Sequence, residues 1–285
     1  MSLPLMPTVP FGEHAITRLI SGGNPLCGNS HFSQELDGEM REYFTDEQVV
    51  EYLLQLEAAG YNTLQARGDY HRILYWLELA RRRGCGLQWI AQTASEMSDV
   101  FQNIRIISAA GAIGIYHQGT KTDNLWLQGK IEEVKPYLSC MRDCGVRVGL
   151  GTHIPEVIEY AEEHSWDVDF YMACFYNLSR KPRQSALVAQ AAKENCPAPR
   201  EEFADADPAA MCRVIRATPK QCLAFKILGA GRRCSTQDDV RAAFGFAYGN
   251  IKPIDAVVVG MYPRCEDQIA LNREYALQAM ERVAG

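Results

Sequence analysis

The sequence lacks the features that membrane and nucleic-acid proteins require. No run of roughly 18 or more apolar residues is present, so no transmembrane helix is expected. The N-terminal segment MSLPLMPTVPFGEHAI has neither the basic start nor the continuous apolar stretch of a secretory signal peptide. Acidic and basic residues are interspersed with a net charge of −6, so no basic stripe for nucleic acid exists. These absences predict a cytoplasmic protein that acts on a small molecule.

Paired cysteine motifs are absent as well. The chain has ten cysteines, but their spacing is irregular and none forms a Cys-x-x-Cys pair. Cys140 and Cys144 lie four residues apart on an expected helix, a spacing compatible with a metal ligand pair and also with simple packing. In a reducing compartment, the cysteines are expected to behave as small apolar residues.

What the chain does have is enough apolar sequence for one large core. Of its 285 residues, 47% are hydrophobic and 22% are charged. This length and composition suit a single α/β barrel, so one domain over residues 1–285 is expected. The sequence does not indicate an oligomeric state.

Strand-like and helix-like segments alternate along the whole chain. Eight of each can be counted, which predicts a closed (β/α)8 TIM barrel rather than an open sheet. Thr45, Pro155 and Ser235 are placed to begin three of the helices. The expected strands are 17–24, 61–67, 87–94, 112–119, 146–153, 168–178, 223–231 and 255–261; the expected helices begin near 45, 71, 98, 127, 155, 208, 235 and 266. Two long loops are expected, at 25–44 and 179–207.

Polar side chains stand at or just beyond the C-terminal end of each expected strand. In this fold, the active site is built from those strand ends and the loops that follow them. One such stretch, GYNTLQARGDYHRI at 60–73, carries several polar groups where a buried strand gives way to a helix. The convergence of polar groups predicts an enzyme. The candidates are Asn24, Cys27, His31, Gln65, Arg67, Tyr70, Gln92, His117, Thr152, His153, Tyr176, Asn177, Lys226 and the segment 261–264.

Lys226 is unusual because it lies in the apolar segment LAFKILGAG. A buried lysine is costly unless it is paired or has a lowered pKa. It therefore suits a general base or a Schiff base to a ketone. The alternative is a structural ion pair with an acid such as Asp169 or Glu96.

Three histidines are expected near the barrel mouth. His117 and His153 end adjacent strands, and His31 lies on the loop after the first strand. Three imidazoles could hold a divalent metal such as Zn²⁺, although no HxH or HExxH spacing supports such a site.

Several stretches resemble the aldo-keto reductase family. GYNTLQARGDYH is similar to the family pattern GxNxxDxAxxYG, IYHQG contains the family's strand-four histidine, ACFYNL resembles its strand-six segment, and VVVGMYPRCEDQIALNREY its closing segment. The resemblance runs along most of the chain and implies a TIM barrel. It also implies a catalytic group in which Tyr70 is the proton donor and His117 its neighbour.

The same comparison shows departures from the family. Gln65 stands at the position of the catalytic aspartate, and Gln92 or Thr93 at that of the lysine. Thr152, His153 and Ala173 replace the residues that hold the nicotinamide amide, while Tyr176 keeps the stacking aromatic ring. Without the lysine, Tyr70 loses the charge that lowers a tyrosine pKa. Arg264, Gln268 and Asn272 are the candidates for holding NADP(H), if it is bound.

The leading hypothesis is a non-redox enzyme of carbohydrate metabolism. It acts as a lyase, isomerase or epimerase by acid/base chemistry on a small polyhydroxylated carbonyl compound. Asn24, Gln65, Arg67 and Gln92 bind hydroxyl groups, with Tyr176 and Asn177 also lining the substrate site. His117 and His153 polarise or protonate the carbonyl group, and Lys226 or Tyr70 moves a proton. The first alternative is an NADP-dependent carbonyl reductase, which would be an oxidoreductase. The second is a non-catalytic binding barrel.

Overall fold

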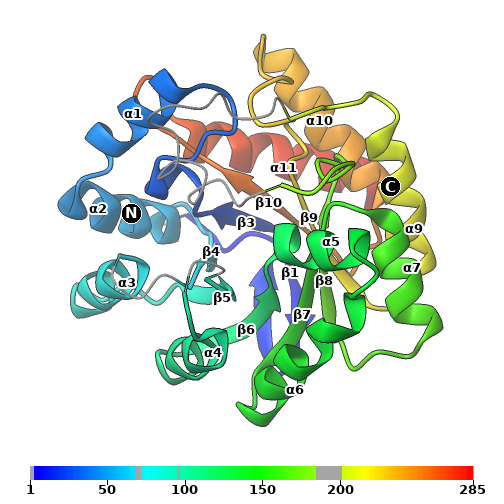
Figure 1. Cartoon of the computed structure of the whole chain (residues 1–285). Helices are drawn as coiled ribbons and strands as arrows, with labels where there is room; N and C mark the ends of the chain where they lie inside the picture. The colour runs from blue at the N-terminus through cyan, green and yellow to red at the C-terminus, as the bar shows by residue number, and fades with distance from the viewer. Residues whose placement is uncertain (1–2, 69–71, 95–96, 184–200, 285) are drawn as a thin grey trace.

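The computed structural model describes residues 3–68, 72–94, 97–183 and 201–284. They form a closed barrel of eight parallel strands in the order β10-β3-β4-β5-β6-β7-β8-β9, with helices around the outside (Figure 1). The predicted single-domain TIM barrel is confirmed. Its strands are β3 (Leu19–Gly22), β4 (Thr63–Arg67), β5 (Gln88–Gln92), β6 (Ala112–His117), β7 (Arg147–Thr152), β8 (Phe170–Cys174), β9 (Gln221–Phe225) and β10 (Ala256–Gly260).

The helices follow the strands as the alternating pattern predicts. Thr45 caps α2, its side chain accepting a hydrogen bond from the Gln48 amide, and Pro155 opens α7 in the first turn. The described helices are α1 (Gln34–Tyr43), α2 (Asp46–Ala58), α3 (Ile73–Arg82), α4 (Val100–Ala109), α5 (Gly119–Leu127), α6 (Lys135–Asp143), α7 (Pro155–Glu163), α9 (Asp207–Ala217), α10 (Gln237–Asn250) and α11 (Gln268–Ala284), with short 3₁₀ turns η1 (Pro25–Cys27) and η2 (Ile131–Val134).

A hairpin that the sequence did not predict precedes the barrel. Strands β1 (Thr8–Phe11) and β2 (His14–Thr17) pair antiparallel around Gly12, whose φ of 65° suits glycine. Phe11 is fully buried and meets Phe170 edge-on, with ring centroids 5.0 Å apart. Both rings belong to the apolar cluster that also contains the barrel residues Ile90 and Leu223. The hairpin therefore completes the packing of the barrel interior.

Three local predictions are wrong. The loop at 25–44 contains η1 and α1, and α6 begins at Lys135 rather than near 127 because α5 and η2 occupy the preceding residues. Thr236, not Ser235, caps α10, because its side chain and that of Asp239 form a reciprocal capping box. Of the expected loop 179–207, residues 184–200 lie outside the described part of the chain.

The expected strand at 223–231 ends early. β9 stops at Phe225, and Lys226 follows with a φ of 59°. Gly229, Ala230 and Gly231 also have positive φ, so the GAG sequence supplies a tight turn where the strand was expected to continue. Lys226 thus stands at the rim of the barrel instead of inside a strand.

The cysteines and the helix lengths bear on two further features of the sequence. Nine cysteines in the described ranges are free, including Cys140 and Cys144. Within those same ranges, no helix is long and apolar enough to cross a membrane.

Candidate active site

The polar strand ends converge on one cavity at the barrel mouth. Eight of the predicted residues line it: Asn24, Cys27, His31, Gln65, Arg67, Gln92, His153 and Lys226. They come from β4, β5 and the loops after β3, β7 and β9, so residues far apart in sequence meet here. The cavity itself is small, about 80 Å³.

A buried carboxylate holds the imidazole of His153. Asp123 on α5 is fully buried, and its Oδ2 lies 2.7 Å from His153 Nδ1. The hydroxyls of Thr152 and Ser179 donate to the same carboxylate at 2.6 and 2.7 Å, and the His153 backbone amide donates at 3.2 Å. Four donors therefore satisfy a charge that would otherwise be costly to bury.

This contact fixes the chemistry of His153. The Asp123 carboxylate only accepts hydrogen bonds, so Nδ1 carries the proton and the lone pair lies on Nε2. Burial, with the nearby positive charge of Arg183, lowers the pKa of His153 to about 4. The imidazole is therefore neutral at physiological pH. Arg183 Nη2 donates a hydrogen bond to the Nε2 lone pair at 3.1 Å, so Nε2 becomes available as a base when this contact opens.

A chain of charged groups continues from His153 along the mouth. Arg183 Nη1 is paired with Glu201 at 2.7 Å, and Glu201 contacts His31 Nδ1 at 2.9 Å. Although burial opposes ionisation of Glu201, the surrounding His31, Lys226 and Arg183 lower its pKa well below the ordinary value. Burial and the charge of Lys226 lower the pKa of His31.

Lys226 faces the same mouth without a direct polar partner among the described residues. Its ammonium lies 5.9 Å from the ring centre of Phe203, and no hydrogen bond or ion pair of its side chain occurs in the described ranges. Burial lowers its pKa, opposed by the charge of Glu201. The suggested structural partner Asp169 is instead bound by Arg142 at 2.8 Å, while Glu96 lies outside the described residues.

Two amides and a phenol form the opposite wall. Gln65 Nε2 donates to the hydroxyl of Tyr116 at 2.8 Å, and that hydroxyl donates to Gln92 Oε1 at 3.1 Å. Burial raises the pKa of Tyr116, so its hydroxyl stays protonated. With Asn24 nearby, this wall offers donors and acceptors suited to hydroxyl groups.

The prediction for His117 is wrong in its placement. Its neighbour Tyr116 points into the barrel, and side chains alternate along a strand, so His117 points toward the helices. There it stacks on Tyr137 of α6, with ring centroids 5.3 Å apart, and its Nδ1 contacts the Thr122 hydroxyl at 2.8 Å. His117 lines neither the mouth nor the adjoining cavity described below.

Tyr176 and Asn177 are also misplaced by the sequence interpretation. Tyr176 is buried against Phe203, with centroids 5.0 Å apart, and Asn177 caps the Ser179 amide instead of facing the mouth. Besides Tyr116, the ring of Phe225 lines the mouth, where it meets His153 edge-on with ring centroids 5.6 Å apart.

Two remaining predictions concern Tyr70 and a metal. Tyr70 lies outside the described residues. Of the three metal candidates, His117 points away from His31 and His153 for the reason given above. Residues 3–68, 72–94, 97–183 and 201–284 contain no group of three His, Cys, Asp or Glu side chains arranged to hold a metal ion.

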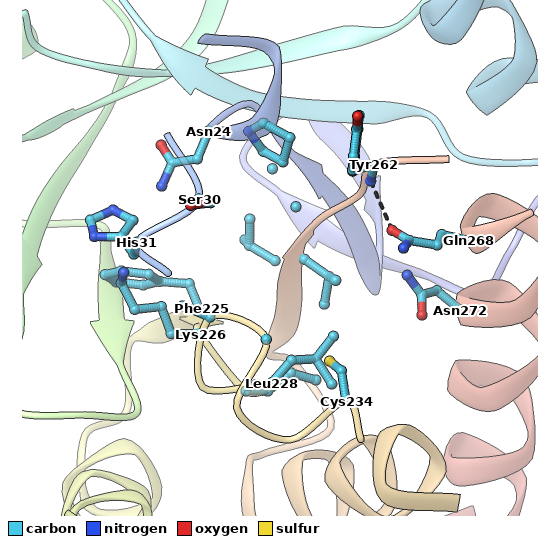
Figure 2. A pocket seen from close by; sticks show the side chains of 18 of the residues that line it. Asn24, Ser30, His31, Phe225, Lys226, Leu228, Cys234, Tyr262, Gln268 and Asn272 are labelled. Carbon is cyan, nitrogen blue, oxygen red and sulfur yellow. Dashed lines mark hydrogen bonds between the residues drawn. The ribbon is translucent and has the colours of Figure 1, made fainter. Parts of the chain in front are cut away.

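A larger groove opens beside the mouth. It has a volume of about 410 Å³ and shares Asn24, His31, Phe225 and Lys226 with the mouth. Figure 2 shows His31, Phe225 and Lys226 on one side of this groove, with Gln268 and Asn272 of α11 on the other. The groove therefore connects the strand ends of the barrel to the face of α11.

The predicted cofactor residues divide between the groove and the surface. Gln268 and Asn272 line the groove, although Gln268 Oε1 already accepts a hydrogen bond from the Tyr262 amide at 2.7 Å. Arg264 lies outside it, exposed and 3.7 Å from Glu39. Among the described residues that line the groove, Lys226 is the only lysine or arginine. This lining does not fit the several phosphate charges of NADP(H).

Sequence reasoning missed Asp123, Arg183 and Glu201. Asp123 was hidden because the segment 119–127 was not recognised as a helix, although Gln118 caps it by accepting from the Lys121 amide. Arg183 and Glu201 belong to the long loop after β8, where no periodicity indicates which side chains turn inward. A buried charge in an apolar context was the only available signal, and it identified Lys226 alone.

Comparison with known proteins supports the fold. No protein-family model matches the sequence, and no curated protein matches it either. A truncated 3-deoxy-D-arabino-heptulosonate 7-phosphate synthase from Thermotoga maritima is similar in structure, with a TM-score of 0.53 and 14% identity over 98% of this chain and 91% of that one. Xanthomonas albilineans dihydropteroate synthase has a TM-score of 0.53 and 15% identity, covering 99% of both chains. At 14–15% identity, the structural similarity shows that this chain is a TIM barrel. It does not support the narrower resemblance to aldo-keto reductases.

Proposed function

We propose that this barrel is an enzyme of the lyase or isomerase type that acts on a small hydroxylated carbonyl compound. One observation carries the proposal: Lys226 lines the same cavity as His153, whose imidazole is hydrogen-bonded to Asp123. The Lys226 side chain has no hydrogen-bonding partner among the described residues. An amine and a base that face one small cavity suit redox-neutral chemistry at a carbonyl group.

The chemistry begins at Lys226. Its lowered pKa increases the fraction of neutral amine, which adds to the carbonyl carbon of the substrate. The carbonyl oxygen leaves as water after two proton transfers, and a protonated imine remains. This cation withdraws electrons from the adjacent carbon, so a proton or a carbon–carbon bond there becomes easier to break.

His153 moves the proton. Once the substrate displaces the Arg183 guanidinium from Nε2, this nitrogen accepts a proton. The proton comes either from the carbon next to the imine, which gives isomerisation, or from a hydroxyl one carbon further, which gives carbon–carbon cleavage. Asp123 stabilises the resulting imidazolium through Nδ1 at 2.7 Å. Asn24 and the Gln65–Tyr116–Gln92 wall bind the remaining hydroxyl groups.

Reductive trapping tests this proposal. The protein is incubated with dihydroxyacetone, glyceraldehyde and pyruvate, treated with borohydride, and analysed by peptide mass spectrometry. A reduced adduct on Lys226 is expected with at least one of these compounds, and none with Lys226→Met. The matched control Lys130→Met removes an exposed lysine and is expected to trap like the wild type.

A second measurement separates the role of Lys226, which forms the imine, from that of His153, which moves the proton. With His153→Gln, trapping at Lys226 is expected to persist, while exchange of the substrate's carbon-bound proton with deuterated water, followed by NMR, is lost. Wild-type trapping at lysines other than Lys226, or unchanged exchange in both variants, overturns the assignment.

The competing hypotheses are an NADP-dependent reductase and a non-catalytic barrel. Gln268 and Asn272 in the groove favour the first, whereas the scarcity of cations there opposes it. Substrate-dependent oxidation of NADPH, measured by absorbance, would support the reductase and refute redox-neutral chemistry. A barrel that neither traps a carbonyl compound nor turns one over would support the non-catalytic alternative.

A further inference from the structure

The groove beside the mouth differs from the mouth in both size and polarity. It holds about 410 Å³ against about 80 Å³. Its walls include Leu36 from α1, Leu228 after β9, Val240 from α10, Val259 from β10 and Leu271 from α11. These apolar side chains come from five segments, so the groove is a feature of the tertiary structure rather than of one helix face.

A single turn joins the groove to the mouth. Lys226 and Ala230 both have positive φ, at 59° and 52°, and the amide of Gly229 bonds back to the Lys226 carbonyl at 2.8 Å. This turn presents Lys226 where the two cavities meet and places Leu228 in the groove beside Cys234 (Figure 2). A compound bound at Lys226 can therefore extend directly into the groove.

The charges of the lining select against an anionic occupant. Beyond Lys226 at the junction, the described lining offers no lysine or arginine, and it includes the carboxylate of Glu266. The neighbouring arginines are engaged elsewhere: Arg232 lies 3.8 Å from the ring centre of Phe203, and Arg264 faces Glu39. A phosphate or carboxylate in the groove would lose hydration without gaining a cationic partner.

The volume of the groove is large enough for more than one aromatic ring, or for a short alkyl chain. A cavity of roughly 150 Å³ is enough to bind benzene, and typical ligand sites range from about 300 to 1,000 Å³. The groove falls within that range.

We propose that the groove is a subsite for an uncharged, apolar arm of the substrate, alkyl or aryl. The carbonyl end of the same molecule occupies the mouth at Lys226, and this part of the inference rests on the proposed function. The substrate is then a hydroxylated carbonyl compound with an apolar substituent rather than a free sugar or a sugar phosphate.

Binding of uncharged probes tests the groove without requiring any reaction. Calorimetry compares 1-O-ethylglycerol, 1-O-hexylglycerol and glycerol 3-phosphate, none of which has a carbonyl group. Each methylene that enters the groove is expected to tighten binding by up to about fourfold. Glycerol 3-phosphate is expected to bind more weakly than the hexyl ether. No gain with chain length, or tighter binding of the phosphate, overturns the proposal.

Cysteine protection locates the probe. Cys234 lines the groove, whereas Cys144 lies beyond the end of α6 and outside it. Hexylglycerol is expected to slow alkylation of Cys234 by N-ethylmaleimide and to leave that of Cys144 unchanged. Equal protection of both thiols, or of neither, contradicts binding in the groove.

A substitution separates this inference from the proposed function. Leu228→Asp places a carboxylate in the groove and is expected to abolish the gain from the hexyl chain. Val283→Asp, at a side chain 51% exposed, is the matched control and should retain the gain. Trapping at Lys226 without any chain-length effect refutes the subsite alone. A chain-length effect without trapping refutes the proposed chemistry alone.

Discussion

The substitution Asp123→Asn tests the electrostatic centre of the candidate site. The carboxylate is fully buried and accepts hydrogen bonds from Thr152, Ser179 and two nitrogens of His153. Asparagine has nearly the same shape, but one of its two terminal groups is a donor. Whichever way the amide is oriented, its NH₂ group faces at least one existing donor.

The size of the effect follows from these contacts. A hydrogen bond to a charged group contributes about 1.5–3 kcal/mol, and a buried donor left without a partner costs about 1–3 kcal/mol. Part of this loss is recovered because the imidazole of His153 can move its proton to Nε2 and accept at Nδ1. We therefore expect Asp123→Asn to lower the free energy of unfolding by about 2–4 kcal/mol.

The tautomer change carries the functional consequence. Once Nε2 is protonated, it can no longer act as the base at the mouth, so proton exchange should fall far more than binding. Comparable substitutions of an aspartate that orients a catalytic histidine lower turnover by up to about 10⁴-fold. Stability is measured by denaturant unfolding, the tautomer by ¹⁵N NMR of the imidazole, and exchange by NMR in deuterated water.

A matched variant and a clear contrary result complete this experiment. Asp143→Asn alters an exposed carboxylate at the end of α6 and should change stability by less than about 0.5 kcal/mol. If Asp123→Asn leaves His153 protonated at Nδ1 with proton exchange intact, Asp123 does not set the tautomer and the reasoning fails.

Two further predictions concern packing and pH. A Cβ on Gly149 in β7 would lie under 3.0 Å from Phe170 and Tyr116, so Gly149→Ala should destabilise the barrel by about 1–3 kcal/mol. A Cβ on Gly245 in α10 would meet nothing within 4 Å, so Gly245→Ala should stabilise that helix by about 0.5–1 kcal/mol. Thermal unfolding of both variants measures these changes. Burial lowers the pKa of His117 from 6.5 to about 4, so the folded state binds its proton more weakly than the unfolded state does. Neutral His117 therefore contributes about 3 kcal/mol to the free energy of unfolding above pH 6.5, and this contribution is lost as the pH falls toward 4. The substitution His117→Phe should remove that part of the pH dependence of stability, measured by denaturant titration. An unchanged pH profile in that variant would show that His117 is not buried as a neutral group.

The sequence was sufficient for the architecture because that information is local and repeated. Each strand is a short apolar run, each helix has an apolar face, and caps such as Thr45 mark where helices begin. Closure into a barrel then follows from eight repetitions. The hairpin around Gly12 escaped notice because its strands have four residues each, too few for a periodic pattern.

The site was predictable only in part, and the errors have one geometric cause. Residues at a strand end alternate between the barrel mouth and the helix layer, and a shift of one residue reverses the direction of the side chain. Gln65, Arg67 and His153 line the mouth, while His117 and Tyr176 do not. Sequence position placed all of them near the rim without determining which way each pointed.

The sequence by itself therefore determined the barrel, the rim on which polar groups gather, and the unusual lysine at position 226. Only the tertiary structure decided that Asp123 holds His153, that Arg183 and Glu201 reach the mouth, and that an apolar groove opens beside Lys226. Local patterns along a chain specify strands and helices. The direction of a side chain, and its partner from a distant segment, depend instead on how those elements pack.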